Sequence, residues 1–123
     1  MTSPRILLAA LAALLLSAGP AMAQEAKMAD GILVDASGRT LYTFDKDTPN
    51  SGKSVCNGEC AALWPPVPAK SGDLKAPYSA VTRDDGSKQL AYNGKPLYLF
   101  VKDKKPGDRS GDKVKDVWHV VKN

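Results

Sequence analysis

Cys56 and Cys60 are the residues of this chain best suited to chemistry. They are its only cysteines, and three residues separate them. In an oxidising compartment such a pair predicts a disulfide, whose small loop would contribute about 2 kcal/mol by pinning a local turn. In reduced form, the two thiolates together with His119, the only histidine, would instead suit Cu(I). A structural disulfide is therefore expected, and copper handling or thiol redox chemistry is the alternative.

The other polar residues do not form a known catalytic or metal-binding motif. Asp45 and Asp47 open a segment that begins like a calcium loop, but Pro49 stands at a ligand position and Cys56 stands where the bidentate glutamate belongs. Phosphate-binding glycine loops, serine nucleophile elbows and zinc-binding helices are absent from the sequence. The sequence thus predicts no catalytic residues, no cofactor and no metal beyond the copper alternative, and the protein is not expected to be an enzyme.

A ten-residue segment occurs twice. Residues 38–47 and 94–103 share Gly, Leu, Tyr, Phe, Lys and Asp in the same register, and a tryptophan follows each copy, Trp64 and Trp118. The motif residues are Tyr42, Phe44 and Asp47 in the first copy and Tyr98, Phe100 and Asp103 in the second. Two copies of one pattern in a chain of 123 residues predict two copies of one structural unit.

The repeated residues favour packing over chemistry. In a strand the tyrosine and phenylalanine of each copy point to the same face, where they would build the core of a small domain. Asp47 and Asp103 follow the strands, so their carboxylates are expected to accept N–H groups of the next loop. The alternative is that Tyr42, Tyr98 and the two tryptophans line a paired ligand surface.

The two copies resemble a known family. Each matches the pattern Y-x-(F/W/Y)-x-x-D, and residues 56–66 resemble a C-x-x-x-C-x-x-x-W-P-P segment of a bacterial secreted-repeat family, described as predicted lipoproteins. The resemblance covers residues 30–121 and implies a secreted protein of unknown function. This chain has no cysteine for lipid attachment, so we expect a protein without a lipid anchor.

The elements expected to position these residues are mostly short strands. Residues 32–34 and 40–44 predict a hairpin, residues 79–101 a three-stranded meander that turns at Asn93-Gly94, and residues 117–121 a last strand. A short helix is expected over residues 58–63, with Asn57 as its N-cap. The predicted fold is a small two-repeat antiparallel β domain, hairpin plus meander, with this helix near the cysteines. The repeats are expected at about 30–68 and 78–121.

The N-terminal residues predict export. Arg5, the apolar run of residues 6–16 and the Ala21-Met22-Ala23 site are typical of a signal peptide over residues 1–23, cleaved after Ala23. The mature chain, residues 24–123, would form a single periplasmic or secreted domain without a transmembrane segment. Its small positive charge is interleaved with aspartates, which argues against nucleic acid as a partner. We expect a non-enzymatic binding or interaction module for an unknown cell-envelope protein or small ligand.

Overall fold

The computed structural model describes residues 25–70 and 73–122. The predicted signal peptide lies outside these residues. The described chain is mostly short antiparallel strands, which confirms the predicted class. The elements are β1 (Ala26–Ala29), β2 (Ile32–Asp35), β3 (Tyr42–Phe44), α2 (Glu59–Leu63), β4 (Tyr78–Thr82), β5 (Lys88–Tyr92), β6 (Lys95–Pro96), the 3-10 turn η2 (Val114–Asp116) and β7 (Trp118–Val120).

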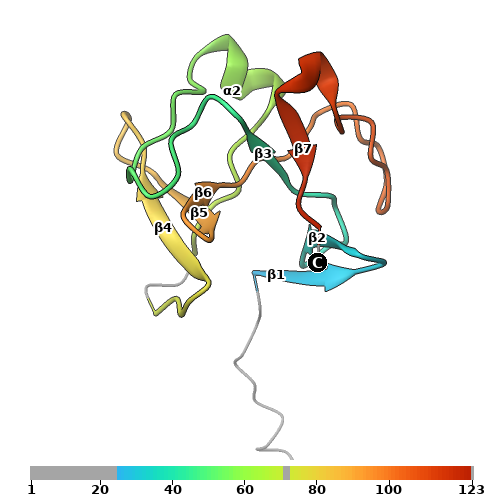
Figure 1. Cartoon of the computed structure of the whole chain (residues 1–123), viewed down its shortest axis with the longest axis horizontal. Coiled ribbons are helices and arrows are strands. Elements are labelled where there is room, and N and C mark those ends of the chain that lie inside the picture. Colours follow the sequence, from blue (N-terminus) through green and yellow to red (C-terminus); the bar gives the residue numbers. More distant parts are fainter. Residues whose placement is uncertain (1–24, 71–72, 123) are drawn as a thin grey trace, which may run out of the picture.

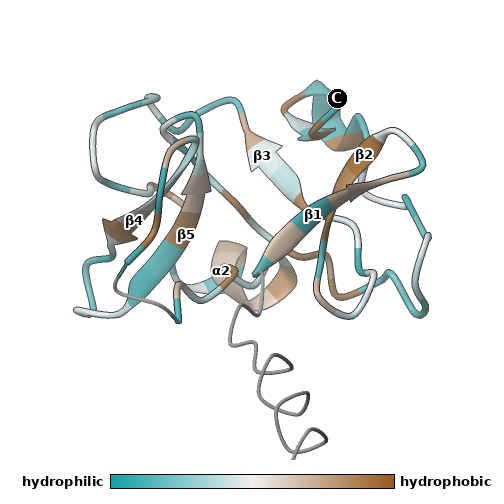
Figure 2. Ribbon diagram, turned by 90° about the horizontal axis from the view of Figure 1, so that it is seen from below, coloured by the Kyte–Doolittle hydropathy of each residue, from teal (hydrophilic) through white to brown (hydrophobic). Residues whose placement is uncertain are grey.

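Two hairpins flank the centre of the molecule. β1 pairs with β2 and β4 pairs with β5, and Figure 2 shows these hairpins on opposite sides of β3. The chain turns between β1 and β2 at Asp30 and Gly31, with φ values of 51° and 84°. Asn93 and Gly94 make the turn between β5 and β6 with φ values of 51° and 80°. Positive φ at both positions is characteristic of type I′ turns, which explains why Asp-Gly and Asn-Gly stand there.

The two repeats are interlaced. β3, from the first repeat, pairs with β7 at the end of the second, so that Tyr42 lies opposite Val120; the two strands run side by side in Figure 1. Reciprocally, the Leu99 N–H of the second repeat donates to the Pro65 carbonyl of the first at 2.7 Å. Between these contacts Tyr42 and Tyr98 exchange backbone hydrogen bonds of 2.8 and 2.9 Å. An approximate twofold axis therefore passes between these two tyrosines.

The first repeat differs in detail from the hairpin that its sequence predicts. The turn is present, because the Leu41 N–H donates to the Leu33 carbonyl at 3.1 Å. However, the ladder partner of β2 is β1, a strand that the sequence analysis missed, and β3 pairs with β7. Local periodicity identifies a strand but does not name its partner, and here the partner lies in the other repeat.

The second repeat follows the predicted meander more closely. β4 and β5 coincide with expected strands, and β7 lies within the expected last strand. The third strand is shorter and earlier than predicted, since β6 covers only Lys95–Pro96. The residues that follow β6 continue as an extended segment: the Leu97 N–H donates to the Leu90 carbonyl at 2.9 Å, and Tyr98 then pairs with Tyr42.

Helix α2 lies where the sequence predicts it, but the expected N-cap is wrong. Gly58 occupies that position with a φ of 60°, and no side chain caps the helix. The Asn57 side-chain oxygen instead accepts a hydrogen bond from Arg83 Nη2 at 3.0 Å. A guanidinium donor therefore holds the amide that was expected to cap the helix.

Stacked aromatic rings form the centre of the core. Trp64 and Trp118 lie face to face, with centroids 3.8 Å apart and planes within 3°. Each tryptophan also stacks on the phenylalanine of the other repeat: Trp64 on Phe100 at 4.0 Å and Trp118 on Phe44 at 4.2 Å. A second cluster lies beside the stack and consists of Ala26, Leu33, Leu41, Val67, Leu90 and Leu97. Aromatic stacking and apolar burial thus hold the two repeats together.

Candidate functional site

Each motif tyrosine bonds to the motif aspartate of the other repeat. Tyr42 Oη donates to Asp103 Oδ2 at 2.6 Å, and Tyr98 Oη donates to Asp47 Oδ2 at 2.5 Å. The tyrosines are 0% exposed, and Asp47 and Asp103 are 6% and 4% exposed. This exchange between repeats was not predicted from the sequence, although the shared register of the two copies is consistent with a symmetric arrangement.

The second oxygen of each aspartate holds the loop that follows it. Asp47 Oδ1 accepts the Val55 N–H at 2.7 Å, and Asp103 Oδ1 accepts the Ser110 N–H at 2.9 Å. The loop-capping role predicted for both carboxylates is therefore confirmed. One carboxylate thus fixes its own loop and the tyrosine of the other repeat.

The surroundings keep the two phenols protonated. Burial raises the pKa of Tyr42 and Tyr98 well above the ordinary range, and the hydrogen bonds to Asp103 and Asp47 raise it further. Burial also raises the pKa of Asp47, although hydrogen bonds from Tyr98 and the Val55 N–H oppose that shift. These groups form structural hydrogen bonds within the core.

The structure places the expected ligand-surface aromatics inside the protein. Tyr42 and Tyr98 are fully buried, and Trp64 and Trp118 are 3% exposed. The tryptophan faces are covered by other rings. A ligand could therefore touch only the edges of the tryptophans, which border a groove described below.

The cysteines form the predicted disulfide. Cys56 and Cys60 are bonded, and their Cα atoms lie 5.2 Å apart. The third ligand of the copper alternative, His119, bonds through Nε2 to Asp45 Oδ2 at 2.8 Å. In residues 25–70 and 73–122, no group of three or more His, Cys, Asp or Glu side chains is arranged to hold a metal ion.

Arg83 ties the disulfide loop to the second hairpin. It is 6% exposed, and its Nη1 donates to Gln89 Oε1 at 2.7 Å and to Ser54 Oγ at 3.0 Å. Its Nη2 donates to the Cys56 carbonyl at 2.6 Å. This role could not be predicted from the sequence, because an arginine next to a turn of charged residues is usually exposed.

A groove, here called the axial groove, lies between α2 and η2. Its volume is about 460 Å³, and Figure 1 shows α2 near the red segment that precedes β7. The side chains of Leu63, Trp64, Val114, Val117 and Trp118 supply its apolar lining, with Cys60 and Phe44 beside them. Leu63 is 39% exposed. Lys46 and Lys115 also line the groove, together with Glu59.

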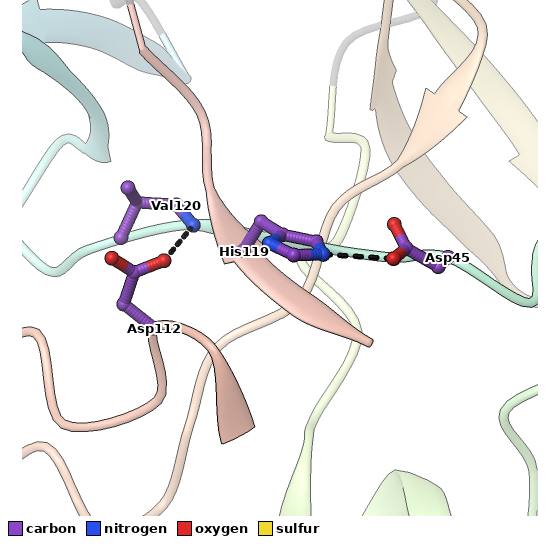
Figure 3. A network of polar contacts seen from close by, with 4 residues as sticks. All are labelled: Asp45, Asp112, His119 and Val120. Atoms are coloured by element: carbon purple, nitrogen blue, oxygen red, sulfur yellow. Dashed lines mark hydrogen bonds and ion pairs between the residues drawn. The ribbon is translucent and has the colours of Figure 1, made fainter. Parts of the chain in front are cut away.

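A second cavity, here called the lateral cavity, lies beside β3 and β7 and has a volume of about 320 Å³. It contains the pair of His119 and Asp45, whose side chains point toward one another in Figure 3. Both are partly exposed, at 40% and 54% of their side chains. Asp112 accepts the neighbouring Val120 N–H at 3.1 Å, which anchors β7 next to the pair.

Comparison with known proteins assigns the chain to a family. A family model described as a secreted repeat of unknown function matches residues 26–68 and 79–122. The chain belongs to this family, as its motifs indicated, and the two matches correspond to the two interlaced halves. Searches of curated proteins and of solved structures gave no match. No helix of the described residues is long and apolar enough to cross a membrane.

Proposed function

We propose that this secreted-repeat protein is a non-enzymatic binding module and that the axial groove is its docking surface for another protein of the cell envelope. The observation that carries the proposal is the apolar lining of this groove. Leu63, Val114 and Val117 are all partly exposed along it. Apolar side chains gathered in an exposed groove are typical of interaction sites.

The proposed occupant is an extended segment of a partner that carries a hydrophobic side chain next to acidic residues. The apolar lining would bury the hydrophobic side chain between the two helical turns. Lys46 and Lys115 are exposed and outnumber Glu59 among the charged groups of the groove. Acidic residues in the partner would complement this excess of positive charge and favour the correct orientation.

The buried motif supports this role by fixing the walls of the groove. Trp64 directly follows α2, Trp118 follows η2, and the two rings stack on each other. The disulfide pins α2 from the other end through Cys60. A groove built on such a rigid base is largely pre-organised, which reduces the entropy lost on binding.

A photo-crosslinking amino acid at position 63, in the cells that produce the protein, tests the proposal. We expect a discrete adduct at position 63 and none at position 55, because Val55 is 58% exposed but does not line the groove. Equal adducts at both positions would argue against the groove.

Binding of the purified partner then tests the chemistry. Leu63→Asp should weaken it at least about tenfold, as the loss of a central apolar contact does. Reversing Lys46 and Lys115 to glutamate should also weaken it, whereas reversing Lys53 and Lys104, which lie outside the groove, should not. Unchanged affinity of Leu63→Asp would overturn the proposal.

A further inference from the structure

We propose that the lateral cavity is a second binding site, one that takes a small organic dicarboxylate and binds it more tightly when His119 is protonated. This site is separate from the axial groove and does not depend on the proposed function. The shape and charge of the cavity support this site, as does a difference between the two halves of the molecule.

Three elements contribute to the cavity. β3 provides Thr43 and is followed by Asp45, the β5–β6 hairpin provides Tyr92, Asn93 and Lys95, and β7 provides His119 and the residues after it. Val121 supplies an apolar part of the wall, whereas the Val120 side chain is buried in the core on the other face of β7. A volume of about 320 Å³ falls within the range of small-molecule sites. The cavity thus combines an apolar wall with hydrogen-bond donors.

The charges of the cavity favour an anion with two carboxylates. Lys95 and Lys122 reach it from different elements, and both are exposed. Among the described residues, no ion pair uses either ammonium group. Asp45, the acidic residue of the lining, forms a hydrogen bond with His119 and leaves the lysines as the larger charge of the cavity. Two ammonium groups therefore remain for an external ligand, and a dicarboxylate offers each of them a carboxylate while its methylene carbons contact Val121.

The other half of the molecule shows that the fold does not require the histidine–aspartate pair. The Asp45 N–H donates to the Val117 carbonyl at 2.8 Å, and at the equivalent place the Val101 N–H donates to the Leu63 carbonyl at 3.1 Å. Val101 therefore occupies the position of Asp45.

Strand pairing likewise identifies the residue that is equivalent to His119 in the other half. Tyr42 lies opposite Val120 and Tyr98 lies opposite Pro66, so the residue before Pro66, Pro65, is the equivalent of His119. In the other half of the molecule, Pro65 and Val101 therefore occupy the backbone positions that His119 and Asp45 occupy here. The ionisable pair is therefore a feature of one half only, and the backbone pairing of the other half forms without it.

His119 makes the proposed site sensitive to pH. A protonated His119 keeps its bond to Asp45 and adds a positive charge beside the two lysines, so an anion binds more tightly at low pH. The polar and charged groups that line the cavity together with the imidazole are Thr43 and Asp45, Tyr92, Asn93 and Lys95, and Lys122. Asp112 is occupied by the Val120 N–H.

Succinate is the probe for the test, with the neutral succinamide as its control. In NMR titrations of the exported protein, succinate should shift the backbone amides of Asn93, Lys95 and Val121 in a saturable way. Its affinity should be about fivefold higher at pH 5.5 than at pH 7.5, as one added charge at a partly exposed site provides. Succinamide should cause no comparable shift. Absence of saturable binding of succinate overturns the proposal.

Variants separate the contributions of the charged groups. Replacing Lys95 and Lys122 together by glutamine should weaken succinate binding about tenfold, as expected for two partly exposed charge contacts. The matched replacement of Lys88 and Lys113, outside this cavity, should leave it unchanged. Equal weakening in both pairs would indicate unspecific attraction and would overturn the site.

His119 and Asp45 have effects of opposite sign. His119→Gln should bind succinate like the parent at pH 7.5 but should not bind it more tightly at pH 5.5. Asp45→Asn should bind more tightly than the parent at pH 7.5, because it removes the competing carboxylate. A pH dependence that survives in His119→Gln contradicts the role of the histidine.

Discussion

At the scale of single residues, the phenol hydroxyls of Tyr42 and Tyr98 explain the repeated motif. Each hydroxyl donates a hydrogen bond to the aspartate of the other repeat and makes one further hydrogen bond. Tyr42 Oη accepts the Gly111 N–H at 3.1 Å, and Tyr98 Oη bonds to Ser54 Oγ at 2.5 Å. A buried carboxylate is unfavourable unless hydrogen bonds satisfy it. The tyrosine hydroxyl and the loop N–H together meet that need for each aspartate.

Removing one hydroxyl should therefore destabilise the fold. Tyr98→Phe leaves Asp47 buried without one of its donors, and we expect a loss of about 1–3 kcal/mol in the free energy of unfolding. Denaturant titration measures this loss. Tyr92→Phe is the matched control, since Tyr92 is only half-buried and should change stability little. A loss in Tyr98→Phe no larger than in the control would contradict the structural role of the hydroxyl.

The raised pKa of the two buried tyrosines predicts unfolding in alkali. Below pH 10 both phenols are protonated in the folded and the unfolded chain, so their stabilising effect is complete. As the pH rises past 10, the unfolded chain loses protons that the folded chain keeps, and stability falls. Tyrosinate absorbance and circular dichroism should change together above pH 10. Full ionisation of all tyrosines near pH 10 with the circular dichroism unchanged would exclude this coupling.

At the scale of elements, the strands are too short to be stable by themselves. β3 and β7 have three residues each, and isolated hairpins are marginal in water. The aromatic stack supplies the stability that these ladders lack, because each of its inner rings is covered on both faces.

The two phenylalanines at the ends of this stack should contribute differently to the free energy of unfolding. Phe100 is 5% exposed, and Phe100→Ala should cost about 3–5 kcal/mol in unfolding free energy. Phe44 is only half-buried, so Phe44→Ala should cost less, although the sequence predicts equivalent places for both. Denaturant unfolding of the two variants tests this order. An equal cost would mean that exposure of Phe44 does not reduce its contribution.

The disulfide should stabilise the loop that it closes without being required for the fold. Reduction releases a small loop, so we expect a loss of about 2 kcal/mol with the fold retained. The Arg83 bond to the Cys56 carbonyl remains after reduction and still holds the loop to the second hairpin. Circular dichroism and thermal unfolding with and without reductant measure the effect. Global unfolding on reduction alone would show that the disulfide carries more of the stability than its loop length indicates.

Much of this element structure could be predicted from the sequence, for local reasons. Asn93-Gly94 identified a turn, the cysteine spacing identified the disulfide, and Asp47 and Asp103 identified loop caps. Contacts between distant residues could not be predicted in the same way. The pairing of β3 with β7, the tyrosine–aspartate exchange and the proximity of His119 to Asp45 depend on how the repeats cross. The burial of Arg83 could not be predicted either, because its hydrogen-bond partners Ser54 and Cys56 lie far from it in the sequence.

At the scale of the whole molecule, neither half contains a complete core. The tryptophan of each half stacks on the phenylalanine of the other, and each central strand segment pairs across the axis. Folding should therefore be cooperative over the entire domain. Partial structures would expose the rings and the unpaired strand edges.

Separate halves test this cooperativity. Peptides of residues 24–72 and 73–123 should each be unfolded alone, because each lacks its partner strands and rings. Mixed at equal concentration, they should associate and recover the circular dichroism of the intact chain. A stable monomeric fold in either peptide would contradict the interlaced core.

The crossing of the two halves also bears on how such a chain can acquire new properties. A single unit could close the same core by pairing with an identical copy, but every surface residue would then appear twice, related by symmetry. Once both units belong to one gene, each can change alone. The disulfide stands in the first unit, where the second has Val114 in place of Cys60, and the histidine stands in the second unit, where the first has Pro65. The two repeats thus form one nearly symmetric scaffold with two chemically distinct sides.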